Sequence, residues 1–167
     1  ELRDALQSRI AAHQNHDTAP RMRLLGAVTE AEKQQLLSHC DLFALPSCER
    51  TEAFGMVLLE AMAHGKPCLA SALPGSGMPW VVASSGAGRL APPQDVNAWS
   101  QALGWMARHP EQRQAMGAAG QAAFGQRFTA HASAQALGAL YPAEGADPER
   151  DASPRRTLIV IPAREAP

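Results

Sequence analysis

The chain has 167 residues, enough for one domain of ordinary size with a real hydrophobic core. Hydrophobic residues make up 46% of it, charged residues 19%, and the net charge is -1, which excludes a disordered chain and a strongly basic nucleic-acid binder. No stretch approaches the roughly 20 continuous apolar residues of a membrane span, and the N-terminus has no signal-peptide core. We therefore expect a soluble, cytoplasmic protein.

The first part of the chain alternates between helix and strand patterns. Residues 2–12 place apolar side chains near helical spacing, and the apolar run at 22–26 predicts a short strand closed by Gly26. Thr29 and Glu32 have the spacing of a capping box, so a helix is expected to begin there.

The middle of the chain repeats this alternation. The apolar run at 41–47 predicts a buried parallel strand, and a helix is expected over 55–64, with Gly65 and Pro67 placed to end it. The next expected elements are a strand at 67–71, a loop rich in glycine and proline at 72–79, and a strand at 88–93.

From Asp95 to about Leu140 the pattern predicts helices, broken near His109-Pro110 and Phe128-Thr129. Strands alternating with helices are typical of parallel βαβ units. The expected fold is therefore α/β, a Rossmann-like parallel sheet with helices on both faces, followed by C-terminal helices. Ligands of such sheets bind at the carboxyl ends of the strands, where segment 47–56 is expected to lie.

The composition changes after Tyr141. Residues 143–156 are rich in proline, alanine and charge without apolar periodicity, as in a linker. Residues 157–167 begin with a β-branched run that predicts a strand, and nothing in this sequence could pair with it. We interpret that strand as the start of a second, truncated domain. Because the chain does not begin with Met, residues 1–142 are likewise expected to be an N-terminally truncated domain.

The cysteines and histidines predict no site of their own. Cys40, Cys48 and Cys68 form no CxxC pair and join no histidine at metal-ligand spacing. We expect three buried, reduced thiols without a redox or zinc role. The six histidines are scattered along the chain, and none is predicted to be catalytic.

The stretch "ERTEAFGMVLLEAM" at 49–62 is the candidate site. The first amides of a helix lack intrahelical acceptors and, with the helix dipole, favour an anion such as a diphosphate, which Gly55 would leave free to approach. Glu60, in the second turn, could accept hydrogen bonds from the hydroxyls of a ribose, and Glu52 would face the other end of the anion. Spacing alone favours two solvated glutamates over such a site.

The segment "LPSCERTEAFGMVLLEAMAHGKP" resembles the E-x7-E segment of family 4 glycosyltransferases, which are retaining enzymes of the GT-B fold that use nucleotide sugars. The resemblance extends to both flanks, 21–47 and 71–103, and covers about residues 1–142. Within that family, "ERTEAFG" and "GSGMPWV" are most similar to bacterial mannosyl- and rhamnosyltransferases of surface polysaccharide synthesis.

The resemblance implies roles for the residues of this segment. Glu52 would be the catalytic residue, contacting the donor sugar and helping to stabilise charge at the anomeric centre, and Glu60 would hold the ribose. The backbone facing the sugar and diphosphate would come from Phe54, Gly55, Met56 and Val57, and the loop Gly75-Ser76-Gly77 would lie near the donor. Trp80 stands where many members of the family carry glutamate.

The resemblance also implies partners. The donor would be a nucleotide diphosphate sugar, the acceptor a glycan or a lipid-linked acceptor at the inner face of the membrane, and neither a metal nor a cofactor is expected. The acceptor half and a basic pair of the family do not precede Glu1, so this chain alone is expected to be inactive. Residues 157–165 resemble the opening strand of family 2 glycosyltransferases, which have the GT-A fold.

Two other functions remain open from the residues themselves. One is a non-catalytic βαβ interaction module, in which Glu52 and Glu60 are merely solvated. The other is a nucleotide-sugar epimerase of GT-B architecture, which would share the fold and differ in its chemistry.

Overall fold

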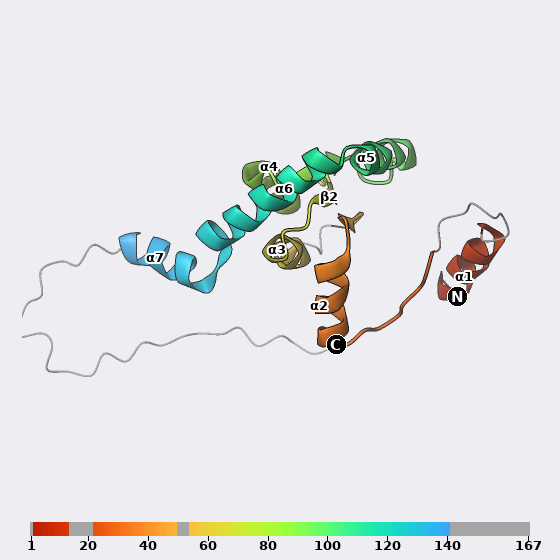
Figure 1. The fold of residues 1–167 in the computed structure, drawn as a ribbon, viewed down its shortest axis with the longest axis horizontal. Coiled ribbons are helices and arrows are strands. Elements are labelled where there is room, and N and C mark those ends of the chain that lie inside the picture. Colours follow the sequence, from red (N-terminus) through yellow and green to blue (C-terminus); the bar gives the residue numbers. More distant parts are fainter. Residues whose placement is uncertain (1, 14–21, 50–53, 141–167) are drawn as a thin grey trace, which may run out of the picture.

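The computed structural model describes residues 2–13, 22–49 and 54–140 (Figure 1). The elements in chain order are α1 (Leu2–His13), α2 (Glu30–His39), β1 (Phe43–Leu45), α3 (Met56–Ala63), β2 (Cys68–Ser71), α4 (Met78–Ser85), β3 (Gly88–Ala91), α5 (Val96–Arg108), α6 (Pro110–Ala123), the π-helix η1 (Phe124–Phe128) and α7 (Ala130–Leu140). The predicted linker at 143–156 and the predicted strand at 157–167 lie outside the described residues.

The three strands form one parallel sheet in the order β1-β2-β3. Ala44 of β1 lies opposite Leu69 of β2, and Leu69 lies opposite Arg89 of β3. Parallel neighbours need a crossover, and here α3 links β1 to β2 while α4 links β2 to β3. The carboxyl ends of all three strands therefore lie at one edge of the sheet.

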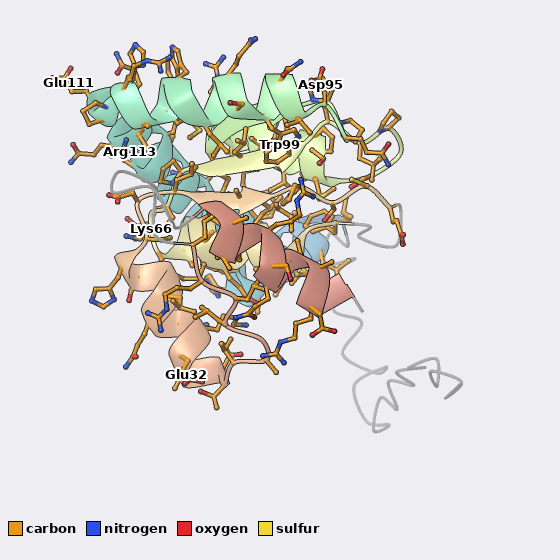
Figure 2. The ribbon with its side chains drawn as sticks, turned by 90° about the vertical axis from the view of Figure 1, so that its right-hand side faces the viewer. Glu32, Lys66, Asp95, Trp99, Glu111 and Arg113 are labelled. Carbon is orange, nitrogen blue, oxygen red and sulfur yellow. The ribbon has the colours of Figure 1, made fainter. Side chains whose placement is uncertain are left out.

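Helices cover both faces of this sheet, because successive side chains of a strand point to opposite faces. Cys68 and Ala70 of β2 are buried against Leu58 of α3 and the apolar face of α4. Leu69, between them, is buried on the other face with Met106 of α5. Figure 2 shows α5 lying across the strands, with Trp99 on the side of the helix toward the sheet. The predicted α/β fold is confirmed.

Helix α6 approaches the core closely because small residues line its contact. A Cβ atom at Gly117 would lie 2.2 Å from the Gly65 carbonyl oxygen, and one at Gly120 would lie 2.9 Å from Ala87 Cβ. Since η1 continues directly from α6, this close packing brings Phe124 and Phe128 against α3 and the core cluster around it.

The predicted strand at 22–26 is wrong. These residues belong to no strand, and Met22, Leu24 and Leu25 are exposed. A strand is stable only when a neighbouring strand pairs with its backbone groups, and the described part of the chain offers this segment no such neighbour.

Helix α4 was not predicted, because its start was interpreted as part of the loop 72–79. Pro79 stands in the first turn of α4, where a helix tolerates proline since that amide has no intrahelical partner. The helix ends at Gly86, whose φ of 65° is left-handed. The strand and helix boundaries elsewhere agree with the predicted ones to within a few residues.

The prediction of three buried thiols is also wrong in part. Cys68 is fully buried and Cys40 is half-buried, but Cys48 is exposed, because it lies beyond Pro46 where the chain has left the sheet. Burial raises the pKa of the Cys68 thiol to about 12, which keeps it protonated and unreactive. Among residues 2–13, 22–49 and 54–140, no cluster of His, Cys, Asp and Glu could hold a metal ion. None of the described helices is long and apolar enough to cross a membrane.

Candidate functional site

Helix α3 begins at Gly55, after the carboxyl end of β1, and Gly55 has the left-handed backbone angles φ 76° and ψ 52°. A Cβ atom there would lie 2.8 Å from Leu58 Cδ1 and 2.9 Å from Met78 Cγ. Both the backbone conformation and the available space therefore require glycine.

The first turn of α3 has amides available for a ligand. Gly55 has no side chain with which to cap the helix, and no acidic residue stands in the first turn. The Leu58 amide donates to the Gly55 carbonyl at 2.8 Å, whereas the described residues provide no acceptor for the amides of Met56 and Val57. Such amides and the helix dipole together favour an anion.

The side chains around this helix start are partly open to solvent. Phe54 is 37% exposed and Met56 is 62% exposed, while Val57 is half-buried. Glu52, the predicted catalytic residue, lies outside the described residues.

Glu60 forms an ion pair with a residue of the neighbouring helix α2. Lys33 Nζ lies 2.7 Å from Glu60 Oε2 and 2.9 Å from Glu30 Oε2. The Oε2 atom of Glu60 is itself buried and has no other polar partner among the described residues. The pKa of Lys33 is raised, because the carboxylate of Glu60 and then that of Glu30 favour its charged form. Glu60 is therefore a paired residue and not a merely solvated one.

A hollow of about 310 Å³ lies beside Glu60. On one side His64 Nε2 and Gln34 Oε1 are 2.6 Å apart, which joins α3 to α2 (Figure 1). The residues around the hollow come from α2, α3 and η1: Gln34, Met56, Leu59, Glu60, Ala63, His64, Phe124 and Phe128. Its walls are thus mainly apolar, with polar groups where α2 meets α3.

The loop Gly75-Ser76-Gly77 leads into α4. Gly75 is left-handed with a φ of 78°, and Ser76 Oγ accepts a hydrogen bond from the Met78 amide at 3.2 Å. The Met78 side chain packs beside Gly55, so the structure brings the end of this loop next to the start of α3. Of the predicted site residues, those at 54–57 and those at 75–77 are therefore neighbours in space.

An aromatic cluster beside this helix start was not predicted. The ring centroids of Phe54, Trp80 and Phe128 lie 6.0–6.5 Å apart. The Arg127 guanidinium lies 5.2 Å from the centre of the Trp80 ring and donates hydrogen bonds to the carbonyl and the hydroxyl of Ser84. Trp80 stood out in the sequence as a departure from the family pattern, but no local signal connects it with η1.

The chain matches known proteins over most of its length. The model of the family Glycosyl transferases group 1 matches residues 3–123. The D-rhamnosyltransferase WbpZ of Pseudomonas aeruginosa is 36% identical over 109 residues, which are 65% of this chain and 28% of that protein. The phosphatidyl-myo-inositol mannosyltransferase of Mycolicibacterium smegmatis is 38% identical over 87 residues, which are 52% of this chain and 22% of that protein.

Solved structures share the fold. Sucrose-phosphate synthase from Thermosynechococcus elongatus superimposes with a TM-score of 0.68 and 29% identity, over 83% of this chain and 33% of that one. The HepE protein of Anabaena in complex with UDP also superimposes with a TM-score of 0.68, with 26% identity, over 83% of this chain and 36% of that one. The chain spans between 22 and 28% of the two curated relatives named above.

Proposed function

This chain belongs to the family Glycosyl transferases group 1, and from that premise we propose that it is the nucleotide-sugar-binding part of a retaining glycosyltransferase of the GT-B fold. The donor is a nucleotide diphosphate hexose of the mannose or rhamnose type. The acceptor is a glycan or a lipid-linked glycan in surface polysaccharide synthesis.

The start of α3 is the observation that carries this proposal. The amides of Met56 and Val57 have no acceptor among the described residues and can bind an anion, and the Glu60 carboxylate follows on the same helix, beside a hollow of about 310 Å³. A nucleoside diphosphate presents a diphosphate and a ribose with two neighbouring hydroxyls. The diphosphate suits the amides and the hydroxyls suit the carboxylate.

The relatives support the proposed donor. Two of them are named as a rhamnosyltransferase and a mannosyltransferase, and the Anabaena protein was solved with UDP. A nucleotide diphosphate sugar combines these features. The choice among GDP, UDP and dTDP is left to the experiment below.

Transfer breaks the bond between the anomeric carbon and a diphosphate oxygen, so negative charge develops on the departing diphosphate. The amides at the start of α3 are fixed before the reaction and stabilise that charge without a metal. In this proposal Glu52 stabilises the positive charge that develops at the anomeric carbon. The loop at 75–77, which packs beside Gly55 through Met78, closes the other side of the donor.

The remaining parts of the enzyme belong to the same proposal. An acceptor-binding half joins this domain from the N-terminal side, and a second glycosyltransferase domain of the GT-A fold begins near residue 157. The protein works in the cytoplasm, at the inner face of the membrane where lipid-linked acceptors lie. The domain described here has no transfer activity alone.

Calorimetry with GDP, UDP and dTDP tests the donor assignment, on the protein that includes the sequence encoded on both sides of this chain. Glu60→Ala is expected to weaken the matching nucleotide by about tenfold or more, because a hydrogen bond to a charged group is lost. Glu111→Ala, an exposed glutamate on α6 far from α3, is the control and should bind as the wild type does (Figure 2). Unchanged affinity in Glu60→Ala would rule out the ribose assignment.

Glu52→Ala separates the catalytic role from the alternatives. It is expected to bind the nucleotide and to lose transfer activity. Intact transfer would instead favour a non-catalytic role for this segment. Chromatography of the products distinguishes transfer from epimerisation of the donor, since an epimerase would return a changed nucleotide sugar without an acceptor.

A further inference from the structure

We propose that Lys33 is a positioning residue of the donor site, which holds Glu60 by Oε2 and thereby presents Oε1 to the ribose hydroxyls. This inference rests on the proposed function, because it concerns the same carboxylate. It adds a residue of α2 to a site that is otherwise built from α3 and the loops at the edge of the sheet.

The two oxygens of Glu60 have different surroundings. Oε2 is buried and lies 2.7 Å from Lys33 Nζ, and the described residues give it no other polar partner. The Glu60 side chain as a whole is 35% exposed, and since Oε2 is buried this exposure belongs to its other atoms. A carboxylate oxygen accepts hydrogen bonds in more than one direction, so Oε1 can bind two neighbouring hydroxyls while Oε2 stays with the lysine.

The charge of Lys33 also suits this site. A nucleoside diphosphate is strongly anionic, and an uncompensated Glu60 carboxylate one helical turn from the diphosphate would repel it. Lys33 Nζ, 2.7 Å from Glu60 Oε2, partly offsets that repulsion. Glu30 binds the same ammonium group at 2.9 Å, so the lysine is held between two carboxylates and does not have to reach the phosphates itself.

Helix α2 is fixed well enough to serve as the support. Its N-terminus has a complete capping box formed by Thr29 and Glu32. The contact between Gln34 and His64, 2.6 Å long, joins α2 to α3 one turn beyond Glu60. Lys33 therefore approaches Glu60 from a helix that is anchored at its start and tied to α3.

The ordinary alternative is an ion pair that only joins two helices. Partly exposed ion pairs contribute at most about 1 kcal/mol to stability, and a purely structural pair would have no influence on which nucleotide binds. Discrimination between a ribonucleotide and its 2′-deoxy form separates the two roles, because only the presentation of Oε1 affects it.

The test measures the affinity of the extended protein for UDP or GDP, whichever the wild type binds, and for the 2′-deoxy form of the same nucleotide. We expect the wild type to prefer the ribose form by about tenfold. In Lys33→Met this preference should fall to near that of Glu60→Ala, and in Lys33→Arg it should be largely kept. Lys66→Met is the control, since Lys66 makes no ion pair with Glu60 and lies toward the opposite end of α2 from Glu32 in Figure 2.

The outcomes separate this inference from the proposed function. If the wild type binds no nucleotide, the proposed function fails. If the wild type discriminates and Lys33→Met discriminates equally, the positioning role is overturned and the donor site stands. Lys33→Gln, which keeps a polar end, gives the same measurement if Lys33→Met does not fold, and circular dichroism verifies folding of each variant.

Discussion

Helix α2 begins with a complete side-chain cap, whereas α3 begins at a glycine that provides none. At the start of α2, Thr29 Oγ1 accepts from the Glu32 amide at 3.3 Å, and Glu32 Oε2 accepts from the Thr29 amide at 2.7 Å. At the start of α3, Gly55 offers no side chain at all. The cap of α2 stabilises that helix, whereas the uncapped start of α3 can bind a ligand.

Other helices of the domain follow the pattern of α2. Asp95 Oδ1 accepts from the Ala98 amide at 2.9 Å and so caps α5, and Ser76 Oγ accepts from the Met78 amide at the start of α4. The start of α3 has no such side-chain acceptor, and it follows the carboxyl end of β1, as α4 and α5 follow those of β2 and β3. In this fold, ligands bind where a strand ends and a helix begins.

Among the helix-start variants, Gly55→Ala is expected to lose the most unfolding free energy. A left-handed alanine costs about 1–2 kcal/mol, and its Cβ atom would press on Leu58 and Met78, so we expect a total loss of about 2–4 kcal/mol. Urea unfolding measures it, and calorimetry should show weaker nucleotide binding. Gly138→Ala in α7 is the matched control, because a Cβ atom there meets nothing within 4 Å. Wild-type stability in Gly55→Ala would show that this helix start does not need glycine.

Removal of a helix cap should lower the unfolding free energy less than Gly55→Ala does. Thr29→Ala and Asp95→Ala are each expected to lose about 1 kcal/mol of unfolding free energy, because one amide in the first turn loses its acceptor. Asp95→Ala should leave nucleotide affinity unchanged, since α5 lies on the other face of the sheet. Asp95→Asn, which can cap as well as aspartate, is the control. A loss of nucleotide affinity in Asp95→Ala would mean that the capped start of α5 also contributes to nucleotide binding.

The pH dependence of the α2 cap should be the smallest effect. The Thr29 amide, and then the Thr29 hydroxyl, hold the pKa of Glu32 below its usual value of 4.5. A carboxylate with a lowered pKa in the folded state stabilises the protein fully above its unfolded pKa and loses that contribution as the pH falls through the lowered pKa. Glu32→Gln should therefore lower the stability slightly at pH 7 and differ less from the wild type near pH 3, so that its stability curve is less steep below about pH 4.5. Equal slopes for the two proteins in urea unfolding from pH 7 to pH 3 would contradict this.

The sequence predicted best what depends on neighbouring residues. The capping box of Thr29 and Glu32 is present as expected, and the three strands of the sheet lie within the predicted apolar runs. These signals depend on spacing along a few residues. The helix start at Gly55 was predicted for the same reason, because Phe-Gly before an apolar run is itself a local pattern.

The errors and omissions involve contacts between distant segments. Residues 22–26 have the composition of a strand but no paired neighbour among the described residues. Helix α4 was missed because its proline suggested a loop, whereas its packing on the sheet defines it. The ion pair between Lys33 and Glu60 joins two helices with a strand between them in the chain, and no spacing rule connects those residues. The aromatic cluster around Trp80 escaped prediction for the same reason.

Gly117 lies on α6 and does not line the hollow beside Glu60, but it lies in the contact that holds α6 close to the end of α3. The absent side chain lets α6 rest on the Gly65 carbonyl, and η1, which carries Phe124 and Phe128 of the hollow's wall, follows α6 directly. A larger residue at 117 would push α6 away from the Gly65 carbonyl, and we expect the aromatic wall to move with it. A position outside the pocket therefore influences where one of its walls lies.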